Sequence, residues 1–404
     1  MVTKSLLEEL DTNTDHVKDG QPIGKVLSAW LFIALCAFIS SYYLDLPAKA
    51  SNTIYYALFG LPVLFTIVRR RKLFLLNKTA LPFFIFLGLA TIAEFLSIEG
   101  NPILLIKNSI YLIVLYAGIQ YISTNTDGFR WLFAITGLLS VGYFFLPLYQ
   151  WVERYLVTGH SQRIQIYQLN VSRSSLLIAF GMLSLWVLVV EPWLKRKQAN
   201  ALRPIAFFST VAMVCLVAVV FQSRSTLVVL SLFLVCYGIT RSYARQAALI
   251  ALILAGIAFS TGLYDVFLER GISYRGEIWQ DALTRVGLDC SWLTGCGSDG
   301  DYRFAGQFLN PHSGYVATLY YYGFPASVAL FVLICQVFIK GMREKSPYLL
   351  LSTVGWGGAI ASSGGFIHAP EPQWVYLWIP VFLTLASKPK DGNSLSDKNE
   401  DLRT

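Results

Sequence analysis

One histidine and several arginines stand where the chain turns between apolar segments. Arg224 lies in a short polar turn, Arg275 lies in the longest polar stretch, and His312 directly precedes the next apolar run. A guanidinium group matches a phosphate with two parallel hydrogen bonds and stays charged in a low dielectric. An imidazole with a near-neutral pKa is suited to remove a proton as a general base. This combination predicts chemistry on a phosphorylated substrate.

Three further cations lie close to these turns or to the ends of apolar runs. Arg163 and Arg173 belong to an earlier polar connection, whereas Lys107 lies within an apolar run and Glu94 lies at a similar depth in the run before it. An ionisable residue at such a depth is either paired or functional. Two interpretations follow for Lys107: it neutralises Glu94, or it faces a lipid phosphate. The arginines likewise either bind phosphate or pair with acidic residues of the same loops.

The sequence gives little reason to expect a metal or another cofactor. Asp299 and Asp301 form a spaced acidic pair, but in a glycine-rich segment such a pair suits an ordinary Asx turn better than a cation site. There is no CxxC motif and no His–Cys cluster. Cys290 and Cys296 share the same polar stretch, and in an oxidising compartment they could form a structural disulfide.

The elements that must position these side chains are membrane helices. Of 404 residues, 55% are apolar and only 14% are charged, and the mean hydropathy is +0.54. A soluble domain has about a quarter of its residues charged. Because apolar runs of about 20 residues recur from 25 to 387, we expect an all-α integral membrane protein with about twelve transmembrane helices. The expected spans are 25–43, 52–68, 78–98, 103–122, 129–151, 174–194, 204–221, 225–240, 246–263, 312–338, 347–367 and 374–387.

The distribution of cations predicts the orientation of these spans. With both termini on one side, that side holds 22 of the 32 Lys and Arg residues, so the positive-inside rule places it in the cytoplasm. We expect a cytoplasmic arm over 1–24, a polytopic domain over 25–387 and a disordered cytoplasmic tail over 388–404. The net charge of +8 is explained by this topology, so nucleic acid is not an expected partner.

Two outer connections are longer than the others, at about 152–171 and 264–311. A loop as long as the second is usually functional or disordered. Its sequence places Ile278, Ala282 and Val286 on one face of a helix, with Trp279 at the edge. We expect this helix to lie along the membrane interface, apolar face down, as the support of a lid.

Four motifs in this order resemble the O-antigen ligase and O-antigen polymerase superfamily. They are Gln222-Ser223-Arg224-Ser225, Tyr274-Arg275-Gly276-Glu277-Ile278-Trp279, Gly295-Cys296-Gly297, and Pro311-His312-Ser313-Gly314-Tyr315 followed by Gly323. The resemblance covers roughly 150–340, and the twelve-span topology extends it along the chain. The His-Asn pair common in the family is replaced here by His312-Ser313, and the usual Pro-Asn before the sixth span is absent near Arg163 and Arg173.

The resemblance implies a metal-independent, inverting glycosyltransferase of the membrane-embedded C type. Its donor is a glycan on undecaprenyl pyrophosphate, and in the ligase branch the acceptor is the lipid A core of lipopolysaccharide. Carried over residue by residue, Arg224 and Arg275 match the essential arginines and His312 the essential histidine. Arg163, Arg173 and Lys107 are expected to add contacts to the pyrophosphate. The expected location is the inner membrane of a Gram-negative bacterium, with the active site at the periplasmic face.

Two related transferases and one transporter remain as alternatives to a ligase. We favour a ligase over a polymerase that joins lipid-linked repeat units, because the chain is compact and its outer part consists mainly of one loop. A protein O-oligosaccharyltransferase is less favoured, because members of that group tend to be longer. A twelve-span secondary transporter belongs to a different class, but the chain has no clear internal repeat and its charges cluster at one edge.

Overall fold

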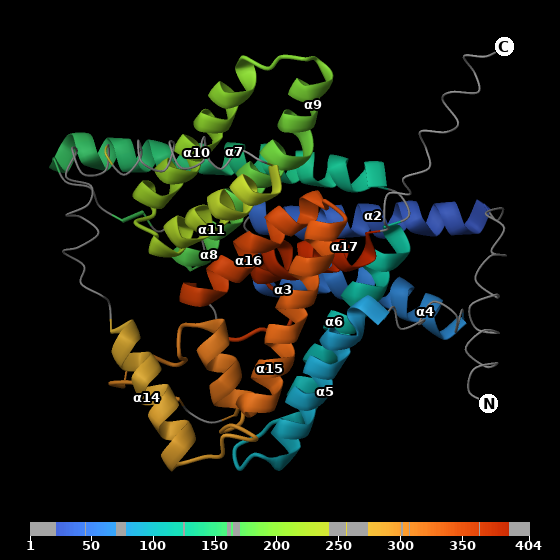
Figure 1. Cartoon of the computed structure of the whole chain (residues 1–404), viewed down its shortest axis with the longest axis vertical. Helices are drawn as coiled ribbons and strands as arrows, with labels where there is room; N and C mark the ends of the chain where they lie inside the picture. The colour runs from blue at the N-terminus through green and yellow to red at the C-terminus, as the bar shows by residue number, and fades with distance from the viewer. Residues whose placement is uncertain are drawn as a thin grey trace.

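The protein is a bundle of helices with a smaller helical and looped part at one end (Figure 1). The structure is a computed structural model. It describes residues 22–44, 46–69, 78–123, 126–159, 163–164, 170–241, 256, 274–299, 302–306, 308–362 and 364–387.

Regular structure in the described residues is helical, apart from two isolated β-bridges, Ser291 with Gly295 and Phe304 with Phe308. Short π-helical or 3₁₀ turns (η) join several helices end to end. The elements are α2 (Pro22–Tyr43), α3 (Ala48–Ile54), η1 (Tyr55–Gly60), α4 (Leu61–Arg69), η3 (Lys78–Ala80), α5 (Leu81–Leu96), α6 (Pro102–Ile122), α7 (Thr126–Thr158), α8 (Val171–Leu185), η4 (Trp186–Val190), α9 (Glu191–Arg196), α10 (Leu202–Val220), α11 (Arg224–Arg241), α14 (Arg275–Leu288), α15 (Gly314–Arg343), α16 (Pro347–Ser362), η5 (Trp374–Trp378) and α17 (Ile379–Ala386).

Nine of the described helical segments are long and apolar enough to cross a membrane. Two shorter apolar segments, α16 and Trp374–Ala386, occupy two more of the expected spans. Every expected span except 246–263 therefore coincides with a helix, and that span lies outside the described residues apart from Gly256. The chain is an all-helical protein of the multi-pass membrane class.

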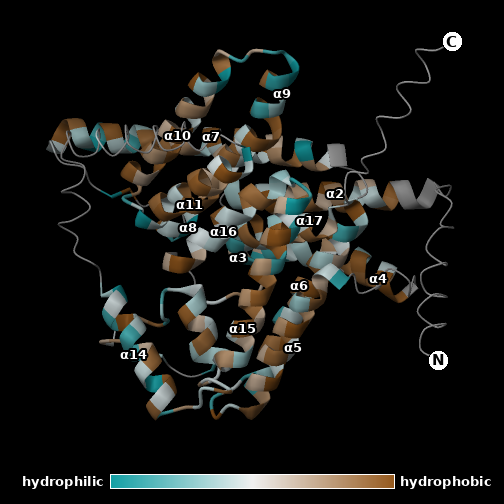
Figure 2. Cartoon of the chain, in the orientation of Figure 1, coloured by the Kyte–Doolittle hydropathy of each residue, from teal (hydrophilic) through white to brown (hydrophobic). Residues whose placement is uncertain are grey.

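The helices differ in how much apolar surface they bury. In the segment Val171–Arg196, 83% of the most apolar window is buried, and nearly every residue of η5 and α17 is buried. A helix that is apolar on all sides and buried belongs at the centre of a bundle. By contrast, α5 exposes Ile92, Phe95 and Leu96, and Figure 2 shows hydrophobic colour along its length. Such surface suits contact with lipid.

The long helix α15 is broken near its first third. Gly323 has φ +75° and ψ −176°, a conformation that only glycine adopts without strain. Pro325, two residues later, has no N–H and crowds the carbonyl four residues before it, that of Tyr321. The break therefore frees backbone carbonyls that need other donors. The part of α15 that precedes the break begins two residues after His312.

Candidate functional site

Arg224 is the first residue of α11 and directly follows Ser223, which is held by other hydroxyl groups. The buried Ser223 accepts hydrogen bonds from Ser175 of α8 at 2.8 Å and from Thr226 at 3.0 Å. Gln222 has φ +46°, which allows the chain to reverse tightly between α10 and α11. The turn is thus fixed to α8, and the backbone of Arg224 has a defined place.

Arg275 begins α14 in the same way, directly after a left-handed residue. Tyr274 has φ +25°, and its carbonyl accepts the N–H of Ile278 at 2.7 Å, which closes the first helical turn. The Arg275 side chain is partly buried. A guanidinium at the first turn of a helix adds its charge to the positive end of the helix dipole, which favours an anion there.

His312 contacts two residues of the preceding loop just before α15 begins. Its N–H donates to Oδ1 of Asn310 at 2.9 Å, and its ring meets that of Phe308 edge to face, with the centroids 5.6 Å apart. Just inside α15, the hydroxyl of Tyr315 donates to the carbonyl of Trp356 at 3.0 Å and anchors the helix start to α16. His312 itself has φ +52°. A non-glycine residue in this region is held there by its surroundings.

These three side chains influence one another electrostatically. Burial and then the charge of Arg224 lower the pKa of Arg275 from its ordinary value. Burial and then the charge of Arg275 lower the pKa of His312. Residues from three separate parts of the sequence therefore share one charged region, which favours the neutral form of His312, the form that can accept a proton.

Backbone strain is concentrated at the same region. Six described residues other than glycine have positive φ, and three of them are Gln222, Tyr274 and His312. Such conformations cost on the order of 1–3 kcal/mol each and cluster at functional sites. Strain at each of the three segments supports the assignment of this region as the candidate site.

Arg163 lies near the turn that carries Arg224. The N–H of Ile164, the next residue, faces the carbonyl of Val220 at 3.5 Å, and Arg163 is exposed. The structure therefore brings the segment of Arg163 to the end of α10, beside the Arg224 turn. His160, in the same connection, lies outside the described residues.

Arg173 has a partner that the sequence did not reveal. Its Nη1 lies 2.9 Å from Oε2 of Glu371, in the segment between α16 and η5, and both side chains are partly buried. The charges of this pair also reach the hydroxyls of Tyr42 and Tyr376. Glu371 gives no local signal in the sequence, because it is far from Arg173 along the chain.

The predicted pair of Lys107 and Glu94 is wrong. Glu94 is buried, and its carboxylate accepts the N–H of Asn101 at 2.6 Å and lies beside Ser298. Lys107 is exposed instead, with its ammonium 6.0 Å from the centre of the Tyr111 ring. The alternative, that Lys107 faces a lipid phosphate, stays a prediction.

The long loop has its own small core, and this corrects the expected placement of its helix. Ile278, Ala282 and Val286 of α14 are buried as predicted, but they pack with Tyr302 and Tyr320 rather than facing a membrane surface. The hydroxyl of Tyr302 donates to the carbonyl of Ile278 at 2.9 Å, and burial raises the pKa of Tyr302. The helix α14 is thus tied to α15.

The disulfide between Cys290 and Cys296 is confirmed, with the Cα atoms 5.0 Å apart. The turn that it closes donates two hydrogen bonds to the break in α15. Cys296 N–H bonds the carbonyl of Tyr320 at 2.7 Å, and Gly297 N–H bonds that of Tyr321 at 3.1 Å. The Gly-x-Gly motif therefore satisfies the carbonyls that the helix break leaves free.

Among the described residues, no group of three His, Cys, Asp or Glu side chains is placed to hold an ion. The backbone N–H of Asp299 donates to the carbonyl of Glu99, between α5 and α6, at 2.9 Å. Asp301 lies outside the described residues.

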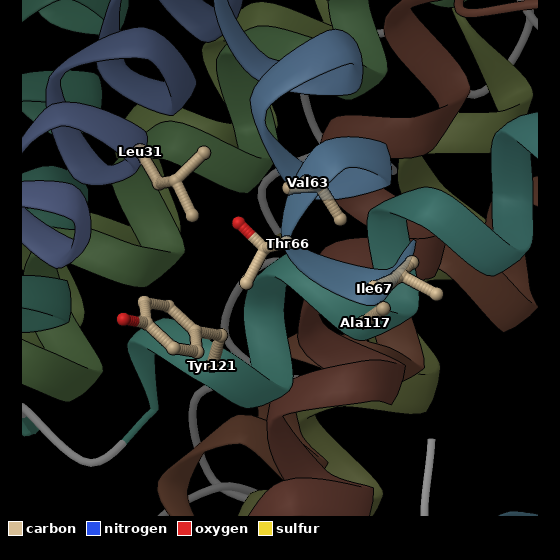
Figure 3. A pocket seen from close by; sticks show the side chains of 6 residues that line it. All are labelled: Leu31, Val63, Thr66, Ile67, Ala117 and Tyr121. Carbon is tan, nitrogen blue, oxygen red and sulfur yellow. The ribbon is translucent and has the colours of Figure 1, made fainter. Parts of the chain in front are cut away.

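A small apolar pocket lies between α2, α4 and α6 (Figure 3). The hydroxyl of Thr66 donates to the carbonyl of Pro62 at 2.7 Å, so it is already satisfied. The lining has no cation, which makes it unsuited to a pyrophosphate. It is formed by Leu31, Val63, Thr66, Ile67, Ala117 and Tyr121.

Comparison with known proteins gives one relative. No family model matches the chain, and no solved structure matches it. A curated O-antigen ligase of Pseudomonas aeruginosa is 28% identical over 190 residues, which are 45% of this chain and 47% of the relative. The chain therefore spans about half the length of this relative in the match. The similarity supports the resemblance seen in the sequence motifs.

The structure adds residues to the candidate site that sequence reasoning did not assign. Asn310 and Phe308 hold His312, Ser175 holds the Arg224 turn, and Glu371 pairs with Arg173. Only Asn310 had a usable signal, because an Asn two residues before the histidine is typical of an Asx turn. The other contacts join segments that are distant in sequence.

Proposed function

We propose that this protein is an O-antigen ligase of the inner membrane of a Gram-negative bacterium. It transfers a glycan from undecaprenyl pyrophosphate to the lipid A core at the periplasmic face, without a metal and with inversion at the anomeric carbon. The observation that carries the proposal is that Arg275 lies near enough to Arg224 and to His312 for their charges to shift one another's pKa values. The similarity to a curated O-antigen ligase supports it.

The reaction needs charge stabilisation more than activation. Pyrophosphate is already a good leaving group, and Arg224 and Arg275 can bind the negative charge that grows on it as the bond breaks. Arg163, Arg173 and Lys107 are proposed as further contacts of the donor phosphates. Because Arg173 already pairs with Glu371, its contribution depends on that carboxylate.

His312 is proposed as the general base. The acceptor hydroxyl oxygen attacks the anomeric carbon from the face opposite the pyrophosphate, and His312 takes the hydroxyl proton. The bond from the anomeric carbon to the phosphate oxygen breaks, and its electrons leave with undecaprenyl pyrophosphate. A histidine whose pKa is lowered is neutral in the free protein and ready for this role.

Complementation tests the proposal directly. A strain that lacks its own ligase, with a matched core type, would express the wild type, His312→Ala, and Arg154→Lys, an exposed outer-end control. We expect the lipopolysaccharide ladder to return with the wild type and the control, and to be absent with His312→Ala at equal membrane levels. Restoration of chain length in a polymerase-deleted strain, without attachment to the core, would instead identify an O-antigen polymerase.

A further inference from the structure

A buried carboxylate surrounded by cations lies at the other end of the bundle from His312. Glu191 is 1% exposed, and its Oε1 lies 2.7 Å from Nη2 of Arg203 and 2.9 Å from Nζ of Lys195. Nε of Arg241 lies 3.9 Å from its Oε2. We call these four residues the Glu191 cluster. Because α11 runs from Arg224 to Arg241, the cluster is about 27 Å from the Arg224 turn.

The charges of the Glu191 cluster do not balance. One carboxylate faces three cations, and a single arginine would be enough to neutralise it. At 3.9 Å the contact of Arg241 with Glu191 is too long for a hydrogen bond, and both Nε of Arg241 and Oε2 of Glu191 are buried without one. The cluster therefore carries an excess of positive charge and a buried donor aimed into it.

The backbone around the cluster is also unusual. The helix that leads to Glu191 widens into the π-helical turn η4, and such turns are frequent at functional sites. Nε of Arg130, from α7, donates to the carbonyl of Leu188 in this turn at 3.3 Å and adds a fourth cation on the same side. Figure 1 shows α9 and the start of α10 projecting as a hairpin.

The helices that carry the charged groups also expose apolar side chains close to them in the sequence. Trp193 of α9, Leu202 and Ile205 of α10 and Ile239 of α11 are each at least 50% exposed. Figure 2 shows the hydrophilic colour of the α9–α10 turn next to hydrophobic helix surface. A ligand that satisfies both surfaces has an anionic head and an apolar tail. Basic pockets between helices at the positive side of a membrane protein bind lipids of this kind.

We propose that the Glu191 cluster binds the phosphate head group of an anionic membrane lipid, whose acyl chains lie along α9, α10 and α11. Lys195 and Arg241 supply the excess charge, and Arg203 keeps Glu191 paired. The site is separate from the proposed transfer chemistry, so its test does not depend on the ligase assignment.

Thermal unfolding of the purified full-length protein in detergent tests the proposal. Phosphatidylglycerol, phosphatidylethanolamine and inorganic phosphate would each be titrated. We expect only phosphatidylglycerol to raise Tm. An equal rise with phosphatidylethanolamine would overturn the proposal, and a full rise with inorganic phosphate alone would overturn the assignment to a lipid.

Substitution of Lys195 and Arg241 tests whether the lipid binds at the Glu191 cluster. Lys195→Gln and Arg241→Gln each leave Arg203 on Glu191, and each is expected to weaken the apparent affinity for phosphatidylglycerol about fivefold. Lys197→Gln, an exposed cation of the same turn, is the control and should leave the affinity unchanged. Equal affinities in all four proteins would overturn the assignment. If Lys195→Gln does not fold, Arg241→Gln still decides, because its contact with Glu191 is the longest.

Discussion

Arg173 and Glu371, which lie in the first turn of α8 and in the segment before η5, form an ion pair of 2.9 Å. The pair joins two segments that are far apart in the sequence, at the end of the bundle that holds the candidate site. The pair also limits how Arg173 can bind a phosphate, because the guanidinium donors that contact Glu371 are not free for a second anion.

The Arg173–Glu371 pair predicts a non-additive effect of substitution. Arg173→Gln and Glu371→Gln should each lower the free energy of unfolding by about 1 kcal/mol. Because both side chains are partly buried, this cost lies between those of breaking an exposed and a buried ion pair. The double substitution should cost no more than either single change, because the interaction is lost only once. Thermal unfolding and donor transfer assays of the three variants measure this. If Arg173→Gln loses transfer while Glu371→Gln keeps the wild-type transfer rate, Arg173 acts on the donor independently of Glu371.

The environment of His312 predicts the pH dependence of transfer. Burial and Arg275 lower its pKa, so the free protein should keep the neutral base down to a pH below about 6.5. The value of kcat/KM should therefore be constant at neutral pH and fall as the pH drops through the lowered pKa. With donor bound, the phosphate charges oppose that of Arg275, so the acid limb of kcat should lie at a higher pH. An acid limb of kcat/KM above pH 7 would contradict the proposed environment.

The arginines are predicted to act through their shape as well as their charge. Arg224→Lys and Arg275→Lys keep a positive charge but lose the planar fork that binds two phosphate oxygens together. We expect each substitution to lower kcat about a hundredfold or more. Removal of one hydrogen-bond donor that stabilises the transition state has an effect of this size in other enzymes. The exposed Arg154→Lys is the matched control. Wild-type rates in both substituted enzymes would remove the pyrophosphate clamp from the mechanism.

Much of the scaffold could be predicted from the sequence because lipid imposes simple rules. An apolar run of sufficient length must form a helix, since no water is present to satisfy the backbone. This is why the expected spans within the described residues coincide with helices, and why the apolar face of α14 was predicted correctly from Ile278, Ala282 and Val286.

The partners of the polar residues could not be predicted in the same way. Lys107 and Glu94 have similar depths in neighbouring helices, yet Glu94 instead contacts Asn101 and Ser298. Depth fixes one coordinate of a side chain, whereas pairing also depends on the rotation of each helix about its axis. The interface placement of α14 was wrong for a related reason, because the loop supplies its own apolar partner in Tyr302.

The break in α15 did carry a signal, in the Gly323-Phe324-Pro325 sequence within a long apolar run. The sequence could not show which segment packs against the break. The carbonyl of Leu293 lies 2.5 Å from the position where a Cβ on Gly323 would stand, so the disulfide-closed turn packs directly against it. Gly323→Ala should therefore force the two segments apart.

Removal of the disulfide is the last prediction, and it tests whether this turn positions His312. The chain-entropy model gives the short loop between Cys290 and Cys296 about 2 kcal/mol of stabilisation. Without it, the turn should detach more often, and the carbonyls of Tyr320 and Tyr321 would then lose their donors, at about 1–3 kcal/mol for each buried group.

Cys290→Ser combined with Cys296→Ser should accelerate amide hydrogen exchange at positions 296 and 297. It should also lower kcat about tenfold or more, because His312 lies two residues before the start of α15 and small displacements are costly in catalysis. Cys335→Ser, a free cysteine of the same helix, should change neither quantity. Faster exchange with unchanged kcat would show that the disulfide stabilises the loop without positioning His312, since a shifted imidazole could not accept the proton at the normal rate.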